Sequence, residues 1–401
     1  MFTTPKNTLK SKKSTFRKVC EWLHLWLGLV SGIVVFVVCL TGGLWVFRYE
    51  VWRITEKYQR VVPQQKALLP PSVIIAKSKD HLVAKGEGSF VFGAITYGGR
   101  EKSVSCSFEG PNEQRASIYV NPYTAEILKD KREPSAAEKF FIFVRAGHRF
   151  FWLPQKIGSP VVGISCILFV IILVTGLVWW YPKKWTSKTR EKSFSIKWSA
   201  KWKRLNIDLH NVLGFYTFLF VFILTISGIV YSFDWFEKGL YSTLTWKSKK
   251  EVPPHPLSDT TQLSPTKIQE PLDVLWKRID HLYNGQYGRL LIEAPHEAKD
   301  PYEVFVNRGD GTRIYDMAFH YYDRHTLKEL PNLNERAIPF TQLALGEKIF
   351  RMNFDIHTGQ ILGLSTKIIA FIACIIGASL PITGVIIWYN RKWGKKKKVA
   401  S

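Results

Sequence analysis

Four long hydrophobic runs constrain this chain more than any other feature. They lie at about residues 26–47, 157–181, 212–233 and 363–388, and almost no charged residue interrupts them. An α-helix of about 20 residues is about 30 Å long, which is the thickness of the hydrocarbon core of a bilayer. Helices in soluble cores are rarely this long and this apolar on every side. The sequence therefore predicts four transmembrane helices.

The first run has a second interpretation as a cleaved signal peptide. A basic arm from Lys10 to Lys18 precedes it, as in such peptides. The run is longer and richer in bulky residues than a signal-peptide core, and no small-residue cleavage site is obvious. A helix that stays in the membrane is therefore favoured.

The net charge of +24 first suggests a nucleic-acid partner, but the distribution of the charge indicates a membrane orientation. Residues 1–20 carry six Lys and Arg, residues 182–208 carry nine, and residues 390–401 carry six. These three segments share one side if the chain crosses the membrane four times. Cytoplasmic loops carry the excess of Lys and Arg, so both termini are expected in the cytoplasm, with runs such as Lys395–Lys398 near anionic lipid. No nucleic-acid partner is expected.

This topology leaves two long polar segments on the outer side of the bilayer. Alternating stretches such as Ser117–Asn121 and Tyr302–Val306 indicate strands there. The fold class is therefore a membrane α-helical protein with two α+β outer domains. Its expected parts are residues 1–48 (cytoplasmic arm and first helix), 49–150 (first outer domain), 151–182 (second helix), 183–208 (basic cytoplasmic loop), 209–233 (third helix), 234–355 (second outer domain) and 356–401 (fourth helix and basic tail).

The chain also repeats itself once. The pairs matched at an offset of 186 residues are His24 and His210, Gly28 and Gly214, Gly42 and Gly228, and Phe47 and Phe233. At an offset of 208, the stretch that begins at Thr175 matches the one that begins at Thr383. At an offset of 202, the stretch from Asn121 matches the one from Asp323. We therefore expect two internal repeats of helix, outer domain and helix, which run parallel across the membrane.

The repeat arranges four of the ten histidines in two pairs. His24 and His210 begin spans that run in the same direction, so they are expected at one depth near the cytoplasmic face. His148 and His357 shortly precede the other two spans and are expected near the outer face. A single histidine at an interface is usually an anchor, but polar residues inside a helix bundle tend to be functional. Imidazole pairs across a bundle commonly ligate haem iron or another transition metal.

Glycines accompany the first histidine pair along the helices. Gly28 lies one turn after His24 and Gly42 lies five turns after it, and the repeat places Gly214 and Gly228 at the equivalent positions. A glycine admits a close neighbour, which is either another helix or a flat macrocycle. No Asp or Glu lies within the four runs, which weakens a closed zinc site and a proton-coupled transporter. Haem between two histidines is favoured.

The second pair is less regular than the first. His148 precedes Gly176 by 28 residues, whereas His357 precedes Gly384 by 27. The pattern Ser135–Glu138 is a capping box, so we expect His148 on a separate helix that starts there. Among the histidines of the outer segments, His320 and His325 lie in an aromatic stretch that could contact a ligand, although a turn and strand edge is the favoured explanation.

The cysteines and the absence of certain motifs limit which disulfides and cofactors are expected. The five cysteines are Cys20, Cys39, Cys106, Cys166 and Cys374. Only Cys106 is expected on the outer side, so no intramolecular disulfide framework is predicted there. No CxxCH motif occurs, which excludes attachment of a c-type haem, and no GxGxxG motif follows a strand, which argues against a nicotinamide or flavin site.

Several stretches together resemble the PepSY-associated transmembrane family, often called iron-regulated membrane proteins. They are "LHLWLGL" at 23–29, "VNPYTAEIL" at 120–128, "GHRFF" at 147–151, "DLHNVLGF" at 208–215, "DIHTG" at 355–359 and the two ends that begin at Thr175 and Thr383. The resemblance extends from about residue 16 to 393. It implies PepSY-like periplasmic domains and inner-membrane ferric-siderophore reductases that use haem. The histidines at the family's motif positions are His24, His148, His210 and His357.

These inferences lead to one functional hypothesis. We expect a protein of the bacterial inner membrane with two haem b groups, each held by two histidines. Electrons would pass from the pair His24 and His210 to the pair His148 and His357 and reduce a ferric siderophore or other ferric chelate in the periplasm. The electron donor is then a separate protein, a quinol or a small reductant. Two alternatives stay open, namely a PepSY-type peptide-binding or regulatory protein without redox activity, and a chelate permease.

Overall fold

Long apolar helices dominate the membrane part of the chain. The computed structural model describes residues 14–261 and 270–394. Within these residues four segments are long and apolar enough to cross a bilayer, namely Thr15–Val46, Gln155–Trp180, Trp202–Ile229 and Leu364–Lys392. The prediction of four spans is confirmed. The basic residues Lys10 and Lys395–Lys398 lie outside the described residues.

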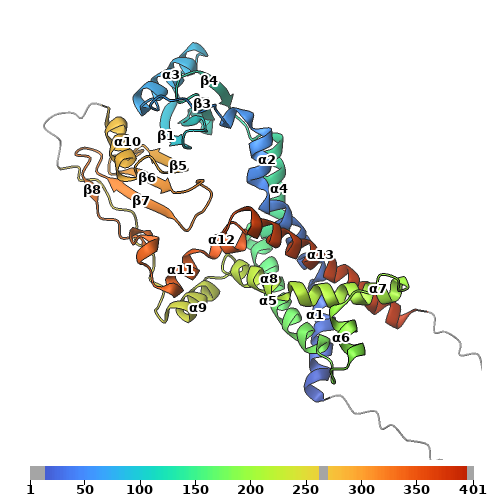
Figure 1. The fold of residues 1–401 in the computed structure, drawn as a ribbon. Helices are drawn as coiled ribbons and strands as arrows, with labels where there is room; N and C mark the ends of the chain where they lie inside the picture. Colours follow the sequence, from blue (N-terminus) through green and yellow to red (C-terminus); the bar gives the residue numbers. More distant parts are fainter. Residues whose placement is uncertain (1–13, 262–269, 395–401) are drawn as a thin grey trace, which may run out of the picture. The chain divides into compact units, whose positions relative to one another are not determined.

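The chain divides into two compact units, which we call the helical unit and the sheet unit. The helical unit contains α1 (Thr15–Val46), the end of α4 (Ala136–Phe150), α5 (Gln155–Trp180), α6 (Ser187–Phe194), α7 (Trp202–Asp208), the π-helical turn η3 (Leu209–Leu213), α8 (Gly214–Ile229) and α13 (Leu364–Lys392) (Figure 1). Helix α1 packs along α5, and α5 packs against α8. Buried apolar residues such as Val35, Phe169 and Val221 fill the space between them.

Small residues bring α13 close to α1. A Cβ atom on Gly377 would lie 3.1 Å from Cys39 Sγ, and one on Gly43 would lie 3.2 Å from Cys374 Cβ. Two helices can approach this closely only where one of them carries no side chain. The glycines therefore set the distance between the first and last spans.

The sheet unit comprises residues Phe47–Ile142 and Lys238–Leu364. Its strands are β1 (Val91–Tyr97), β2 (Val104–Glu109), β3 (Arg115–Val120), β4 (Ile127–Lys131), β5 (Arg289–Glu293), β6 (Tyr302–Asn307), β7 (Met317–Tyr322) and β8 (Glu329–Leu330). Its α-helices are α2 (Arg48–Thr55), α3 (Pro71–Ala84), the start of α4, most of α9 (Asp234–Thr245), α10 (Pro271–Leu282), α11 (Leu345–Arg351) and α12 (Asn353–His357). Short 3₁₀ turns are η1 (Lys57–Gln59), η2 (Pro111–Glu113), η4 (Glu335–Ala337) and η5 (Phe340–Gln342).

The two polar segments expected on the outer side form one sheet rather than two separate domains. The strand order is β4-β3-β2-β1-β5-β6-β7-β8, and all neighbouring strands are antiparallel (Figure 1). At the centre, Ala94–Tyr97 of β1 pairs with Leu290–Glu293 of β5. The expectation of two α+β domains is corrected in this respect. Each four-stranded half leaves an edge strand with unpaired backbone groups, and pairing β1 with β5 satisfies both edges.

Both halves of the sheet contribute to one hydrophobic core. Helices α3 and α10 contact each other, and their apolar sides pack with the buried residues of the strands. The rings of Tyr97 in β1 and Trp276 in α10 stack with centroids 5.5 Å apart. Both carboxylate oxygens of Asp273 in α10 accept hydrogen bonds from Ser72 at the start of α3, each at 2.7 Å. The carboxylate thus caps a helix from the other half of the sheet.

The same turn occurs in both halves of the sheet unit. The N–H of Ala125 donates to the carbonyl of Asn121 at 3.0 Å, and the N–H of Leu327 donates to the carbonyl of Asp323 at 2.9 Å. Ala125 and Leu327 both have a positive φ, of 59° and 54°. These equivalent residues are separated by the offset of 202 found in the sequence. His325 lies in the second of these turns, and its N–H donates to the Asp323 carboxylate at 3.0 Å.

Helix α4 begins at the predicted capping box. The Ser135 hydroxyl accepts a hydrogen bond from the N–H of Glu138 at 3.2 Å, and the Glu138 carboxylate accepts one from the N–H of Ser135 at 2.9 Å. This reciprocal pair satisfies two backbone donors at the helix start. The expectation that His148 lies on a separate helix is therefore confirmed.

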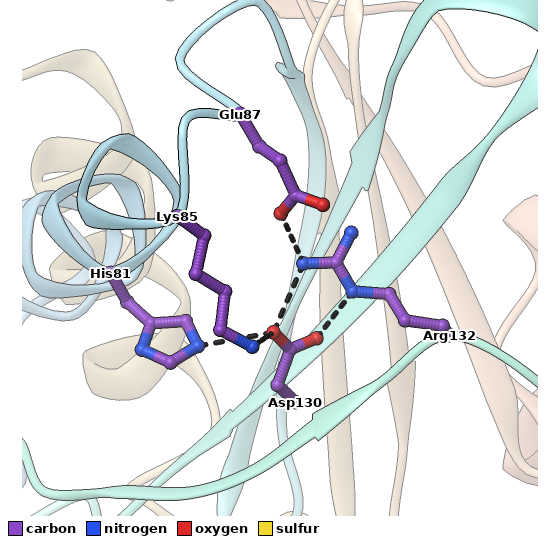
Figure 2. A network of polar contacts seen from close by, with 5 residues as sticks. All are labelled: His81, Lys85, Glu87, Asp130 and Arg132. Atoms are coloured by element: carbon purple, nitrogen blue, oxygen red, sulfur yellow. Dashed lines mark hydrogen bonds and ion pairs between the residues drawn. The ribbon is translucent and has the colours of Figure 1, made fainter.

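A network of charged side chains joins α3 to β4. Figure 2 shows the Asp130 carboxylate with His81 and Lys85 on one side and Arg132 on the other. One carboxylate oxygen lies 2.6 Å from Lys85 Nζ and 3.1 Å from His81 Nε2, and Arg132 contacts both Asp130 and Glu87. Burial by itself raises the pKa of Asp130, but hydrogen bonds from Arg132, Lys85 and His81 outweigh it and hold the pKa well below its usual value. A carboxylate with a lowered pKa stabilises the folded state when it is ionised.

The network predicts a pH-dependent loss of stability on substitution. We expect Asp130→Asn to lower the free energy of unfolding of the sheet unit by about 1–3 kcal/mol at pH 7, because three donors lose a charged acceptor. The contribution is complete above the unfolded pKa of about 3.9 and is lost as the pH falls through the lower folded pKa, so the difference from wild type should shrink below about pH 4. Amide hydrogen exchange in α3 and β4 measures the effect.

A matched control lies in the same sheet. Glu109→Gln removes the exposed ion pair with Arg115, whose atoms are 3.9 Å apart. Its expected effect is less than about 0.5 kcal/mol, since exposed ion pairs contribute little. Equal protection in the Asp130→Asn variant and the wild type would show that the network does not stabilise the unit.

Candidate functional site

The helical unit encloses a cavity among all four spans. Its volume is about 290 Å³, at the lower end of the range for ligand pockets. The lining is mostly apolar and comes from α1, α5, the segment around η3 and α8, and α13. Trp180 and Phe215 form one part of the wall, with parallel rings whose centroids are 3.9 Å apart. The polar side chains in the lining are few, and two of them are histidines.

His24 and His210 face this cavity together. Their ring centroids are 6.2 Å apart and their ring planes are nearly perpendicular, at 89°. Both side chains line the cavity, one from α1 and the other from η3. The structure thus brings together the two histidines that the 186-residue offset pairs in the sequence.

The hydrogen bonds of His24 determine which ring nitrogen carries the proton. Its Nδ1 lies 2.9 Å from the carbonyl oxygen of Ile172 in α5. A carbonyl oxygen only accepts hydrogen bonds, so Nδ1 carries the hydrogen in the neutral ring. The lone pair then lies on Nε2, which is the arrangement found in metal-binding imidazoles with a backbone partner.

His210 has an equivalent arrangement. Its Nδ1 lies 2.8 Å from the hydroxyl of Thr383 in α13. That hydroxyl donates its own hydrogen to backbone carbonyls, at 3.0 Å to Ser379 and 3.1 Å to Leu380. It can therefore only accept from His210, and the lone pair of this ring also lies on Nε2.

His210 lies in a π-helical turn rather than in a regular α-helix. The turn η3 covers Leu209–Leu213 and separates α7 from α8 within the third span. A π-helical turn inserts an extra residue into a helix, rotates the side chains that follow, and often occurs at functional sites. The repeat in the sequence contains no signal for this turn, because His24 occupies an ordinary α-helix.

His148 makes the same type of hydrogen bond at another place in the helical unit. Its Nδ1 lies 2.9 Å from the carbonyl oxygen of Val38 in α1. By the same reasoning its lone pair lies on Nε2. His148 does not line the cavity. His357, the last residue of α12, belongs to the sheet unit, so its pairing with His148 stays a prediction.

Each of these three imidazoles lies against a glycine of a neighbouring helix. A Cβ atom on Gly176 would lie 2.8 Å from His24 Cε1, one on Gly42 would lie 3.0 Å from His148 Cε1, and one on Gly384 would lie 3.5 Å from His210 Cε1. The absence of a side chain therefore creates the space in which each ring lies. Gly176 and Gly384 were not predicted as site residues, although the 208-residue offset pairs them in the sequence.

The four glycines predicted to accompany the first histidine pair lie in different environments. Gly28 and Gly214 line the cavity, as expected for residues near the histidine pair. Gly42 instead faces His148, and Gly228 lies near the end of α8, outside the cavity lining. Gly42 and Gly228 therefore do not line the cavity that His24 and His210 face, and their role in cofactor binding stays a prediction. Eighteen helical residues span about 27 Å, so His24 and Gly42 are too far apart to contact one ligand in this cavity.

The remaining predicted candidates make contacts within the sheet unit. His320 Nε2 lies 2.8 Å from the hydroxyl of Tyr283, and its Nδ1 lies 2.8 Å from the carboxylate of Glu329. His325 lies in a turn. Among the described residues, no group of three or more His, Cys, Asp or Glu side chains could hold a metal ion. Two imidazoles without a third protein ligand suit a metal that arrives with its other ligands in place.

The comparison with protein families agrees with this architecture. Residues 21–391, nearly the whole chain, match the family described as PepSY-associated TM region. The chain belongs to this family. No curated protein matches the chain. This member of the PepSY-associated TM region family is therefore a membrane protein that combines four candidate spans with an antiparallel sheet.

Proposed function

We propose that this protein is a b-type haem protein of a bacterial inner membrane that reduces a ferric chelate, such as a ferric siderophore, in the periplasm. The observation that carries the proposal is the pairing of His24 and His210 across an apolar cavity. Each imidazole is oriented with its Nε2 lone pair available, and neither has a neighbouring carboxylate in the lining.

The spacing of the two rings fits a metal ion between them. With a metal–imidazole bond of about 2.0 Å to each ring, the centroids of two imidazoles that share one metal can lie about 6 Å apart. The observed separation of the His24 and His210 centroids is 6.2 Å. His24 and His210 would hold the metal, and a macrocycle around it would contact the apolar walls of the cavity and the glycines Gly28 and Gly214.

The surroundings of the histidines suit an electron carrier. When bound, haem would supply a one-electron couple between Fe(III) and Fe(II). The Ile172 carbonyl and the Thr383 hydroxyl hold the two rings in one orientation and increase the basicity of Nε2. Apolar burial and such hydrogen bonds are the means by which a protein sets a haem potential.

The direction of electron transfer follows from the proposed topology. The segments rich in Lys and Arg would be cytoplasmic, which places His24 and His210 near the cytoplasmic face. His148, oriented by the Val38 carbonyl, and His357 would hold a second haem near the outer face. An unidentified donor would deliver electrons on the cytoplasmic side. Chelators favour trivalent iron, so reduction at the outer side weakens the complex and releases Fe(II).

The visible spectrum of the purified protein tests the proposal. After expression with ample haem, we expect a sharp Soret band and, on reduction, resolved α and β bands typical of iron with two imidazole ligands. Reoxidation by a ferric chelate should then be measurable as loss of these bands. A colourless protein would contradict the proposal and would favour a binding or regulatory function of the sheet unit.

A further inference from the structure

The cavity lining contains one charged side chain among the residues that the structure describes, and it is Arg391. No Asp, Glu or Lys accompanies it in this lining. A cavity with apolar walls, two imidazoles and one cation favours an anionic group on whatever occupies it.

Arg391 lies at the end of a continuous row along α13. The α13 residues that line the cavity are Leu380, Pro381, Gly384, Val385, Ile387, Trp388 and Arg391. Their spacing of three and four residues keeps them on one side of the helix, over a length of about 16 Å. The row is apolar from Leu380 onward and becomes cationic only in the last turn of the helix.

The guanidinium of Arg391 is close to the histidine pair. Its Cζ lies 5.4 Å from the ring centroid of Trp179. The centroid of the same indole lies 5.4 Å from that of His24, with the two rings edge to face. One aromatic side chain therefore contacts both the cation and the first imidazole.

Other arginines near this end of the helical unit have polar partners. Arg17 donates to the carbonyls of Trp179 and Tyr181 and pairs with Glu21 at 3.4 Å. Arg204 pairs with Asp208 at 2.6 Å. Within residues 14–261 and 270–394, no carboxylate forms an ion pair with Arg391, whose guanidinium there contacts the ring of Trp179.

We propose that Arg391 binds a carboxylate of the cavity's occupant, which is a propionate if the occupant is haem. This inference rests on the proposed function and adds the orientation of the bound haem in the cavity. The propionate edge would lie at the end of the cavity next to Arg391, and the apolar edge would lie among residues such as Val35, Phe169 and Leu380. A guanidinium binds a carboxylate through two parallel charge-assisted hydrogen bonds, which select for one orientation.

A titration with two forms of the same porphyrin tests this assignment. Haem-free full-length protein in detergent is titrated with Fe(III) protoporphyrin IX and with its dimethyl ester, in which both carboxylates are masked. The His24→Ala variant serves as the blank for binding elsewhere. Wild-type protein should bind the free acid at least about ten-fold more tightly than the ester, which corresponds to one charge-assisted pair.

Variants of Arg391 identify the source of this preference. Arg391→Ala should reduce the preference for the free acid to less than about two-fold and leave the affinity for the ester unchanged. Arg391→Lys should be intermediate, because an ammonium lacks the paired donors of a guanidinium. Lys392→Ala is the matched control, since Lys392 contacts Trp388 and Trp393 and does not line the cavity. It should behave like the wild type.

The possible results are distinguishable from one another. Equal affinity of wild-type protein for acid and ester would overturn the inference about Arg391 but not the haem site. Equal weakening of both ligands by Arg391→Ala would mean that the residue only supports the fold. An anionic lipid phosphate could use the same cation; in that case Arg391→Ala would change binding to vesicles containing phosphatidylglycerol and not the ratio of acid to ester, which also overturns the inference. Binding of neither porphyrin by wild-type protein would overturn the proposed function itself.

Discussion

Replacement of His24 or His210 by alanine is expected to remove about half of the bound haem. The two rings are paired at 6.2 Å, so each variant leaves one imidazole and an open coordination position at the same site. Haem at the proposed outer site should be unaffected, because His148 lies on another helix and is held by Val38. Haem per chain is measured from the reduced spectrum in pyridine, and the double variant should lose no more than either single variant.

A control for this prediction is a histidine outside the helical unit. His325→Ala changes a turn residue whose backbone, not its ring, makes the described hydrogen bond, and it should retain all of the haem. Retention of full haem in both His24→Ala and His210→Ala would contradict the assignment of the pair. Loss of all haem in either variant would indicate that the two proposed sites are not independent.

Filling the cavity should weaken haem binding as much as removing one of the histidine ligands. Gly28 lines the cavity, and a Cβ atom added to it would meet no other atom within 4 Å. Gly28→Leu therefore adds a large side chain at the cavity lining, and its Cβ atom has room there. We expect the affinity of this site for haem to fall at least about ten-fold, the usual consequence of overfilling a packed space. The titration that tests Arg391 measures this affinity.

The same substitution should leave the fold intact. A leucine in a helix is favoured over glycine by up to about 1 kcal/mol, so the haem-free variant should be at least as resistant to thermal unfolding as the wild type. Gly28→Ala, which occupies much less of the space, provides a graded control with a smaller loss of affinity. Wild-type affinity in Gly28→Leu would mean that haem, if bound, does not enter this cavity.

The two substitutions examine different requirements of the site. His24→Ala keeps the space and removes a ligand, whereas Gly28→Leu keeps both ligands and removes the space. A site that depends on both the ligand and the space is expected to lose haem binding in both variants. A histidine that served only as an anchor at the membrane interface would make neither substitution important for pigment binding.

Much of the candidate site could be predicted because parts of the sequence match each other at fixed offsets. A single histidine such as His24 carries little information, but an equivalent His210 at the start of a parallel span predicts a pair at one depth. The capping box before α4 likewise predicted a separate helix for His148, since its two hydrogen bonds are local. These inferences use only helix geometry and distances along the chain.

Other parts of the site depend on contacts between helices. Gly176 and Gly384 lie against the two imidazoles, yet no local property distinguishes them from Gly42 or Gly228. Which side of a helix faces which neighbour is decided by packing, and the π-helical turn at His210 changes that orientation further. The pairing of β1 with β5 was missed for a similar reason, because an edge strand carries no signal that identifies its partner.

The sequence by itself predicted the four candidate spans, strands in the polar segments between them and the pairing of His24 with His210, because each follows from periodicity or offset along one chain. The tertiary structure decided that both outer segments share one sheet, that the two imidazoles lie 6.2 Å apart, and that their Nδ1 atoms bond to α5 and α13. It also placed Arg391 at the cavity. These features involve residues more than a hundred positions apart, and only the packing of helices and strands brings such residues into contact.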